Sequence, residues 1–106
     1  MLRWMAEGEK VYARVVNLRF PSEMRDEVVR VGRGLAPVLR ERRGFEGLQL
    51  LTDSEAGEGI IVSFWATEEA AKTSEVDPSY IGQMSLMSSF LYGALSPKTY
   101  EVGVRV

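Results

Sequence analysis

The chain has 106 residues, 45% of them hydrophobic and 26% charged, with a formal net charge of −2, a composition typical of one folded globular domain. Cysteine and histidine are both absent, which excludes disulfides, thiolate nucleophiles and histidine-ligated metal or haem. The acidic balance argues against nucleic acid as a partner, because neutralising phosphates needs clustered lysine and arginine.

Residues 1–10 are predicted to form an N-terminal arm, and residues 11–106 the domain. The hydrophobic stretch in the arm is too short for a signal peptide and is interrupted by Glu7 and Glu9. No apolar run approaches the roughly 18 residues of a membrane span. The expectation is therefore a cytoplasmic protein that does not associate with membranes.

Three predicted strands are apolar on both faces: Val11–Phe20, Leu48–Thr52 and Gly59–Trp65. An antiparallel sheet that is covered on one face should alternate apolar with polar residues, whereas a sheet covered on both faces need not. A chain of this length has helices enough for one face. The second face is therefore predicted to be covered by a second copy of the protein, in a homodimer that packs the two sheets face to face.

The remaining elements follow from periodicity and from turn signals. An amphipathic helix is predicted after the first strand, on apolar residues spaced by three and four: Met24, Val28, Val31, Leu35 and Val38. The strands Phe45–Asp53 and Gly59–Trp65 are predicted to form a hairpin. Thr67 is predicted to cap a short helix, and Asp77 with Pro78 to begin a longer one over Ser79–Leu95. Alternating apolar residues from Tyr100 to Val106 predict a last strand.

The predicted order is thus β-α-β-β-α-β, with the second helix broken in two. With right-handed crossovers this order gives an α+β fold, a ferredoxin-like antiparallel sheet with the helices on one face.

Three segments resemble the antibiotic biosynthesis monooxygenase (ABM-like) family of dimeric α+β barrels. They are Gly44-Phe45-Glu46-Gly47 after the first helix, Leu50-Leu51-Thr52-Asp53 before the hairpin turn, and Ser63-Phe64-Trp65-Ala66-Thr67-Glu68-Glu69-Ala70 after it; the closing Tyr100-Glu101-Val102 is also similar. The resemblance implies a face-to-face dimer with a pocket in each protomer between sheet and helices. It also implies a function among cofactor-free oxygenases of aromatic polyketides or quinols, haem-degrading enzymes and members without known activity.

The haem-degrading branch of this family uses an Asn on the first strand, a Trp in the second helix and a His further along it. Asn17 matches the first position, but Ser74 and Met84 fall near the other two. Haem degradation is therefore not expected.

Three polar residues are candidates for catalysis. Asn17 lies on a strand that is apolar on both faces, where it could hold a substrate carbonyl or an enolate, or instead bond backbone near the strand end. Arg14 is expected to bind an anion, either a ligand or a carboxylate across the dimer, or else to extend its charged end to solvent. Tyr80 is a candidate proton carrier.

Apolar residues suggest where a substrate would bind. Trp65 could form the wall against a flat aromatic ligand, or anchor the corner between strand and helix. Met84, Met87 and Phe90 could line an adaptable pocket, or belong to the core.

The predicted function is a cofactor-independent monooxygenase acting on a small aromatic or quinol-type substrate, with no metal and no cofactor. The alternative is a non-enzymatic dimer that binds a small apolar ligand or serves in assembly. An RNA-recognition module shares the strand order, but it needs aromatic residues on an open, basic sheet. This chain is acidic and its strands are apolar, so RNA binding is not expected.

Overall fold

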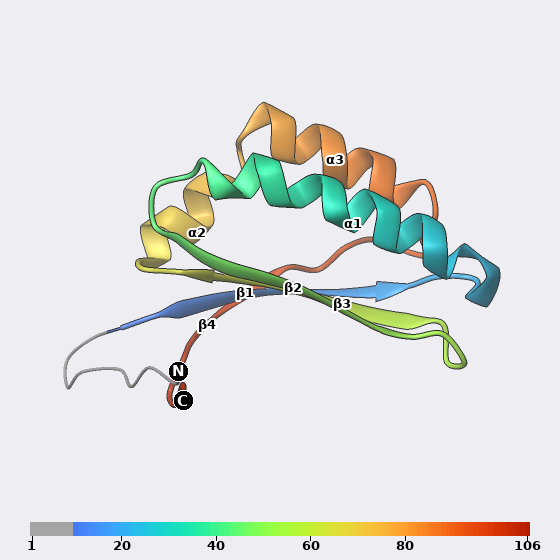
Figure 1. Cartoon of the computed structure of the whole chain (residues 1–106), viewed down its shortest axis with the longest axis horizontal. Coiled ribbons are helices and arrows are strands. Elements are labelled where there is room, and N and C mark those ends of the chain that lie inside the picture. Colours follow the sequence, from blue (N-terminus) through green and yellow to red (C-terminus); the bar gives the residue numbers. More distant parts are fainter. Residues whose placement is uncertain (1–9) are drawn as a thin grey trace.

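The computed structural model describes residues 10–106. In this part of the chain the strands are β1 (Tyr12–Arg19), β2 (Phe45–Asp53), β3 (Glu58–Trp65) and β4 (Lys98–Glu101), and they form one antiparallel sheet in the order β2-β3-β1-β4. The helices are α1 (Arg25–Arg40), α2 (Glu68–Ser74) and α3 (Pro78–Ser88), with a 3-10 turn η1 (Ser22–Met24) before α1. All of them lie on one face of the sheet (Figure 1). The predicted ferredoxin-like α+β fold is confirmed.

The predicted N-terminal arm lies outside the described residues, apart from Lys10, whose Nζ is 3.4 Å from Oε1 of Glu101. Within the described part of the chain, no helix has the length and apolar character that crossing a bilayer requires.

The core lies between the sheet and the helices. Alternate residues of β1 and the turn after it face the helices, and Val16, Leu18 and Phe20 are each 2% exposed. Strand β3 adds Ile61 and Trp65 to the same layer. The apolar face of α1 supplies Val28, Val31, Leu35 and Leu39. The three-and-four spacing therefore identifies Val28, Val31 and Leu35 correctly, but at the end of the helix Leu39 is buried and Val38 only partly so.

Both predicted helix caps in the second half of the chain are confirmed. The Thr67 hydroxyl accepts a hydrogen bond from the Ala70 amide (3.0 Å) at the start of α2. At the start of α3 a carboxylate oxygen of Asp77 accepts from the amides of Ser79 (2.9 Å) and Tyr80 (3.1 Å), and Pro78 is the first helical residue.

Two predicted elements are too long. Helix α3 ends at Ser88 and not at Leu95, because the hydroxyls of Ser88 and Ser89 donate to the backbone carbonyls of Met84 and Leu86 and so compete with helix continuation. The chain is then tied to β1, since the Tyr92 amide donates to the carbonyl of Arg19 (2.8 Å). Strand β4 covers Lys98–Glu101 and not Tyr100–Val106.

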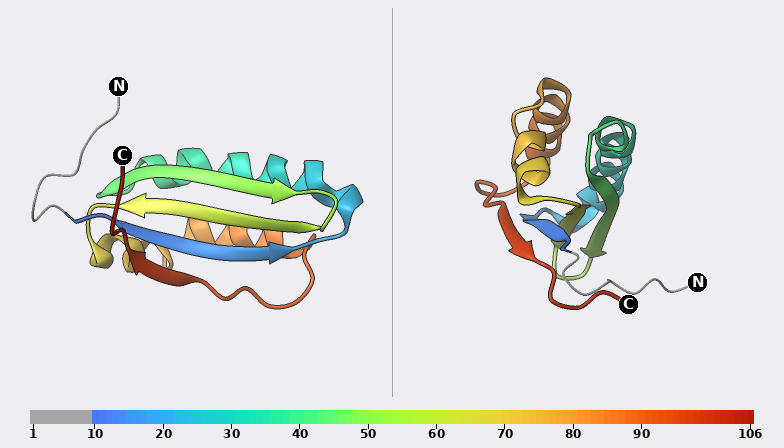
Figure 2. Two further views of the ribbon diagram at one scale, coloured as in Figure 1. Left: turned by 90° about the horizontal axis from the view of Figure 1, so that it is seen from below. Right: turned by 90° about the vertical axis from the view of Figure 1, so that its left-hand side faces the viewer.

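After β4 the chain leaves the sheet edge and crosses the face that carries no helices (Figure 2). Arg105 Nη1 lies 3.1 Å from Oε1 of Glu46 on β2, at the opposite edge, and its guanidinium lies 5.2 Å from the ring centroid of Phe64. We call this side of the sheet the open face. Its side chains come from residues that stand opposite one another in the strand register, including Val15 with Val62, Asn17 with Ile60, and Leu51 with Ile60.

Candidate functional site

A cavity of about 230 Å³ lies between β1, α3 and the segment that leads from α3 to β4. Its walls are apolar apart from a few polar side chains, which is the usual make-up of a small-molecule site. The lining residues are Arg14, Val16, Tyr80, Ile81, Met84, Ser85, Ser88, Leu95 and Pro97. Three of the residues predicted from sequence, Arg14, Tyr80 and Met84, are therefore brought together here.

Arg14 carries a buried charge at this cavity. It points from β1 toward the helices and is 5% exposed. Its Nε donates to Oε1 of Glu75 (2.8 Å), at the end of α2, and its Nη1 donates to the hydroxyl of Tyr80 (2.9 Å). The carboxylate that Arg14 requires thus comes from the same chain, which corrects the prediction of an ion pair between subunits. Burial of a guanidinium is tolerated because these partners replace water.

Tyr80 is held on both sides. The Arg14 guanidinium carbon lies 5.4 Å from its ring centroid, and its backbone amide is fixed by the Asp77 cap. Burial raises the pKa of the Tyr80 hydroxyl above its ordinary value of 10.0, and the nearby Glu75 raises it further, although Arg14 acts in the opposite direction. Tyr80 is therefore a protonated hydrogen-bond donor at neutral pH.

This raised pKa predicts a stability change at alkaline pH. Above about pH 10 the unfolded chain loses the Tyr80 proton while the folded chain keeps it, so the free energy of unfolding should fall as pH rises from 10.0 through the pKa in the folded state. Tyr80→Phe should show a shallower fall over the same range. Urea unfolding of both proteins at a series of pH values checks this. If the free energy of unfolding falls equally with pH in both proteins, the raised pKa of Tyr80 is contradicted.

The other predicted site residues lie elsewhere. Met87 and Trp65 are both 0% exposed in the core, and Phe90 packs against that core. Asn17 is exposed on the open face, because its neighbours Val16 and Leu18 point toward the helices and strand residues alternate. The structure therefore does not bring Asn17 together with Arg14 and Tyr80. Its catalytic role stays a prediction.

Trp65 has the surroundings of a structural anchor. Its indole N–H donates to the Ser63 hydroxyl (2.9 Å), and its ring meets Phe45 edge to face, with centroids 5.5 Å apart and an interplanar angle of 73°. Of the two interpretations drawn from sequence, this geometry favours the anchor at the corner between β3 and α2.

Glu75 was not singled out from sequence, although it fixes the orientation of Arg14. Its position 61 residues away along the chain gives no local signal. The one available hint is general: an arginine on an apolar strand needs a carboxylate, and the helix ends above that strand are where one can be supplied.

The described residues contain no group of three or more His, Cys, Asp or Glu side chains that could hold a metal ion. Met84, which stands near the histidine position of the haem-degrading branch, places a thioether at the cavity. Ser74, near the tryptophan position, is 3% exposed and its hydroxyl donates to the Ala71 carbonyl (2.7 Å).

The sheet order, the one-sided helices and the cavity between them define an α+β protein of the ferredoxin-like type with a pocket beside β1. The family model described as "Antibiotic biosynthesis monooxygenase" matches residues 11–80. The chain belongs to this family. A search of curated proteins gave no match.

Solved structures agree with this fold. A candidate antibiotic biosynthesis monooxygenase from Nitrosomonas europaea superimposes with a TM-score of 0.76 at 10% identity, covering 88% of this chain and 90% of that chain. One from Caulobacter crescentus CB15 has a TM-score of 0.75 at 18% identity, with 89% and 91% covered. A conserved protein from Methanosarcina mazei Go1 has a TM-score of 0.76 at 13% identity, with 89% and 94% covered.

Proposed function

We propose that this protein is a cofactor-independent monooxygenase that oxidises a small aromatic or quinol-type substrate in the Arg14 cavity. The observation that carries the proposal is a buried guanidinium, 5% exposed, beside the Tyr80 hydroxyl at a cavity whose remaining walls are mainly apolar. Guanidinium N–H groups that are already held in place can donate to a substrate phenolate or enolate with little reorganisation. Membership of the monooxygenase family supports the same reaction class.

The chemistry requires an electron-rich substrate. An ionised anthrone, for example, passes one electron to O₂, and the two radicals combine into a carbon-bound peroxide anion. The proton lost when the substrate ionised then returns to this anion and gives a hydroperoxide. Loss of water then leaves a carbonyl, so one oxygen atom enters the product and the other leaves as water. The protein would bind the anion at Arg14, donate a hydrogen bond from the Tyr80 hydroxyl, and exclude water with Val16, Met84 and Leu95.

Two contacts hold Arg14 and Tyr80 in position for this role. Glu75 holds Nε of Arg14 and so fixes the plane of the guanidinium. The Tyr80 oxygen accepts from Arg14, which leaves its own proton for a ligand oxygen in the cavity. An oxyanion bound there would meet donors that need little reorganisation.

We propose in addition that two copies pack through their open faces. Support comes from the open face itself, where Leu51 (51% exposed), Ile60 (36%) and Tyr100 (48%) are large hydrophobic side chains left exposed by the single chain. This arrangement leaves the Arg14 cavity, on the helix side, accessible in each protomer.

Oxygen consumption with a panel of anthrones and hydroquinones tests the reaction. Arg14→Met and Tyr80→Phe should each lower kcat/KM at least tenfold, on the order of one lost charge-assisted hydrogen bond in the transition state. Arg30→Met is the matched control, because Arg30 is exposed on α1 and pairs with Glu27 at 2.7 Å. Its activity should equal that of the unchanged protein.

Asn17→Ala separates the two faces of the sheet. Activity lost in Asn17→Ala but kept in Arg14→Met would contradict the Arg14 cavity and place the reaction at the open face. Binding of a quinone without oxygen uptake across the panel would instead support the alternative, a non-enzymatic protein that binds a small ligand.

A further inference from the structure

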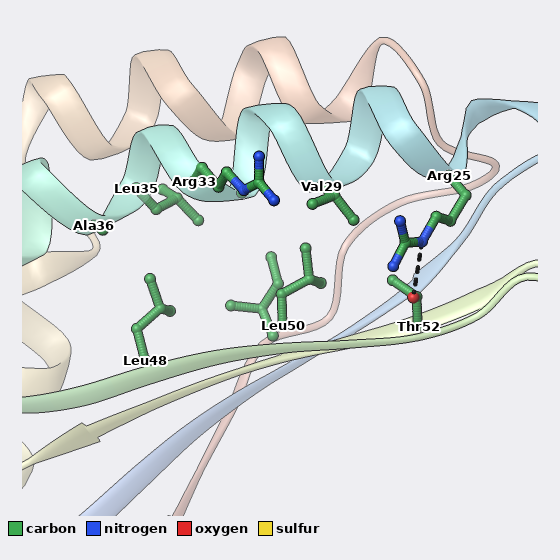
Figure 3. A pocket seen from close by; sticks show the side chains of 10 residues that line it. Arg25, Val29, Arg33, Leu35, Ala36, Leu48, Leu50 and Thr52 are labelled. Carbon is green, nitrogen blue, oxygen red and sulfur yellow. Dashed lines mark hydrogen bonds between the residues drawn. The ribbon is translucent and has the colours of Figure 1, made fainter.

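A second cavity, of about 310 Å³, lies at the other side of the molecule, between α1 and the edge strand β2 (Figure 3). It shares no lining residue with the Arg14 cavity, since the residues around it are Arg25, Val29, Gly32, Arg33, Leu35, Ala36, Leu48, Leu50, Thr52 and Ile61. A volume of this size is at the lower end of ligand pockets, so it suits one small molecule.

The body of this cavity is a groove lined by aliphatic side chains. Leu48 and Leu50 rise from β2 toward α1, and Leu35 and Ala36 face them from the helix (Figure 3). Gly32 brings helix and strand close together, because a Cβ at that position would lie 2.7 Å from Cδ2 of Leu50. The groove therefore follows the line of α1, and from Val29 to Ala36 it is about 10 Å long at the helical rise.

One end of the groove is positively charged. Among the described residues that line it, both charged ones are arginines, Arg25 and Arg33. Their side chains point toward one another from either side of Val29 (Figure 3). Both guanidiniums can donate hydrogen bonds to a carboxylate placed between them.

The contacts of Arg25 leave it available for such an anion. Its Nε donates to the Thr52 hydroxyl (3.3 Å), which turns the side chain toward β2, and its Nη1 lies 3.2 Å from a carboxylate oxygen of Asp26. The Asp26 side chain is 91% exposed, so this pair is a surface ion pair of small net strength. A less hydrated carboxylate, held against the apolar groove, can replace it.

We propose that this groove binds a small aliphatic carboxylate, with its carboxylate between Arg25 and Arg33 and its hydrocarbon chain along Leu50, Leu48 and Leu35. The line of aliphatic side chains along α1 fits a linear hydrocarbon chain. The site is separate from the monooxygenase proposal, and the face-to-face dimer would leave it open because it lies on the helix side.

Titration with octanoate, followed by amide and methyl NMR resonances, tests the site. Octanoate should shift resonances of Val29, Leu48 and Leu50 and leave those of Tyr80 and Met84 in place. Octanol, which has the same chain without the charge, should bind at least tenfold more weakly, and octylammonium weaker still, because the groove presents two cations.

Charge-deleting variants make the test specific. Arg25→Met and Arg33→Met keep most of the apolar stem, and each should weaken octanoate binding at least tenfold while octanol binding is unchanged. Arg30→Met, on the same helix outside the groove, should bind octanoate like the unchanged protein. Ala36→Phe, which fills the groove, should abolish binding of both octanoate and octanol.

Three results would overturn the proposal: no saturable binding of octanoate, equal affinity for octanoate and octanol, or shifts that fall at Tyr80 and Met84 and not at Val29 and Leu50. None of these depends on oxygen consumption, so the proposal stands or falls independently of the reaction assay.

Discussion

Replacing Trp65 by alanine is expected to lower the free energy of unfolding by about 3–5 kcal/mol, the range for truncating a large buried aromatic side chain. Trp65 is 0% exposed, and its removal would leave a cavity next to Phe45. The loss also includes the Ser63 hydroxyl, which is 5% exposed and would lose the indole N–H as its donor. Because domains are stable by roughly 5–15 kcal/mol, this is a large share of the total.

Urea unfolding at one fixed protein concentration measures this loss, since the stability of an oligomer depends on concentration. Tyr92→Ala is the control: that side chain is 61% exposed, and its removal should change the free energy of unfolding by no more than about 0.5 kcal/mol. A loss below about 1 kcal/mol for Trp65→Ala would show that Trp65 is not the anchor of this corner.

Most of the fold can be read from local signals in the sequence. The caps at Thr67 and Asp77 need one side-chain oxygen and an amide two or three residues later, so sequence spacing is sufficient to find them. The apolar repeat of α1 works for the same reason. The ends of elements are different, because α3 stops where Ser88 and Ser89 bond backwards to the helix and where Tyr92 meets β1.

For the last strand, the alternating pattern predicts the wrong bounds. Alternation from Tyr100 to Val106 has the period of a strand, yet β4 ends at Glu101. The chain turns across the open face, where Arg105 reaches Glu46 and Phe64, partners that are distant in sequence. Tertiary contacts therefore decide this segment, and periodicity alone does not contain them.

Only part of the candidate site can be predicted from the sequence. Arg14 stands out because an arginine on an apolar strand must find partners, and the structure supplies Glu75 and Tyr80. Asn17 stands out for the same reason, but it lies on the open face of the sheet, opposite the face that carries Arg14. A strand that is apolar on both sides does not reveal which face meets the helices, so parity could not be assigned from sequence. The groove at Arg25 and Arg33 was missed because exposed arginines on a helix are common.

The strand register shows which side chains meet on the open face. Around Ile60 the register places Leu51 on one neighbouring strand and Asn17 on the other, so apolar and polar side chains share the centre of the sheet. A face of this kind can be tolerated in water, but it is better suited to a second sheet, because burying apolar surface contributes about 25 cal/mol per Å². In a two-fold dimer every such residue is used twice.

Ile60→Glu is therefore expected to convert a dimer into a single-copy species, detected by sedimentation equilibrium at micromolar concentration. In the isolated protomer Ile60 is already 36% exposed, so the glutamate would be solvated there; in the dimer two carboxylates would be removed from water, at a cost of several kcal/mol. Leu86→Glu places the same charge on α3, at a side chain that is 44% exposed, and should leave the mass at two chains. If the unchanged protein already sediments as one chain, or Ile60→Glu keeps two, the open face is not the interface.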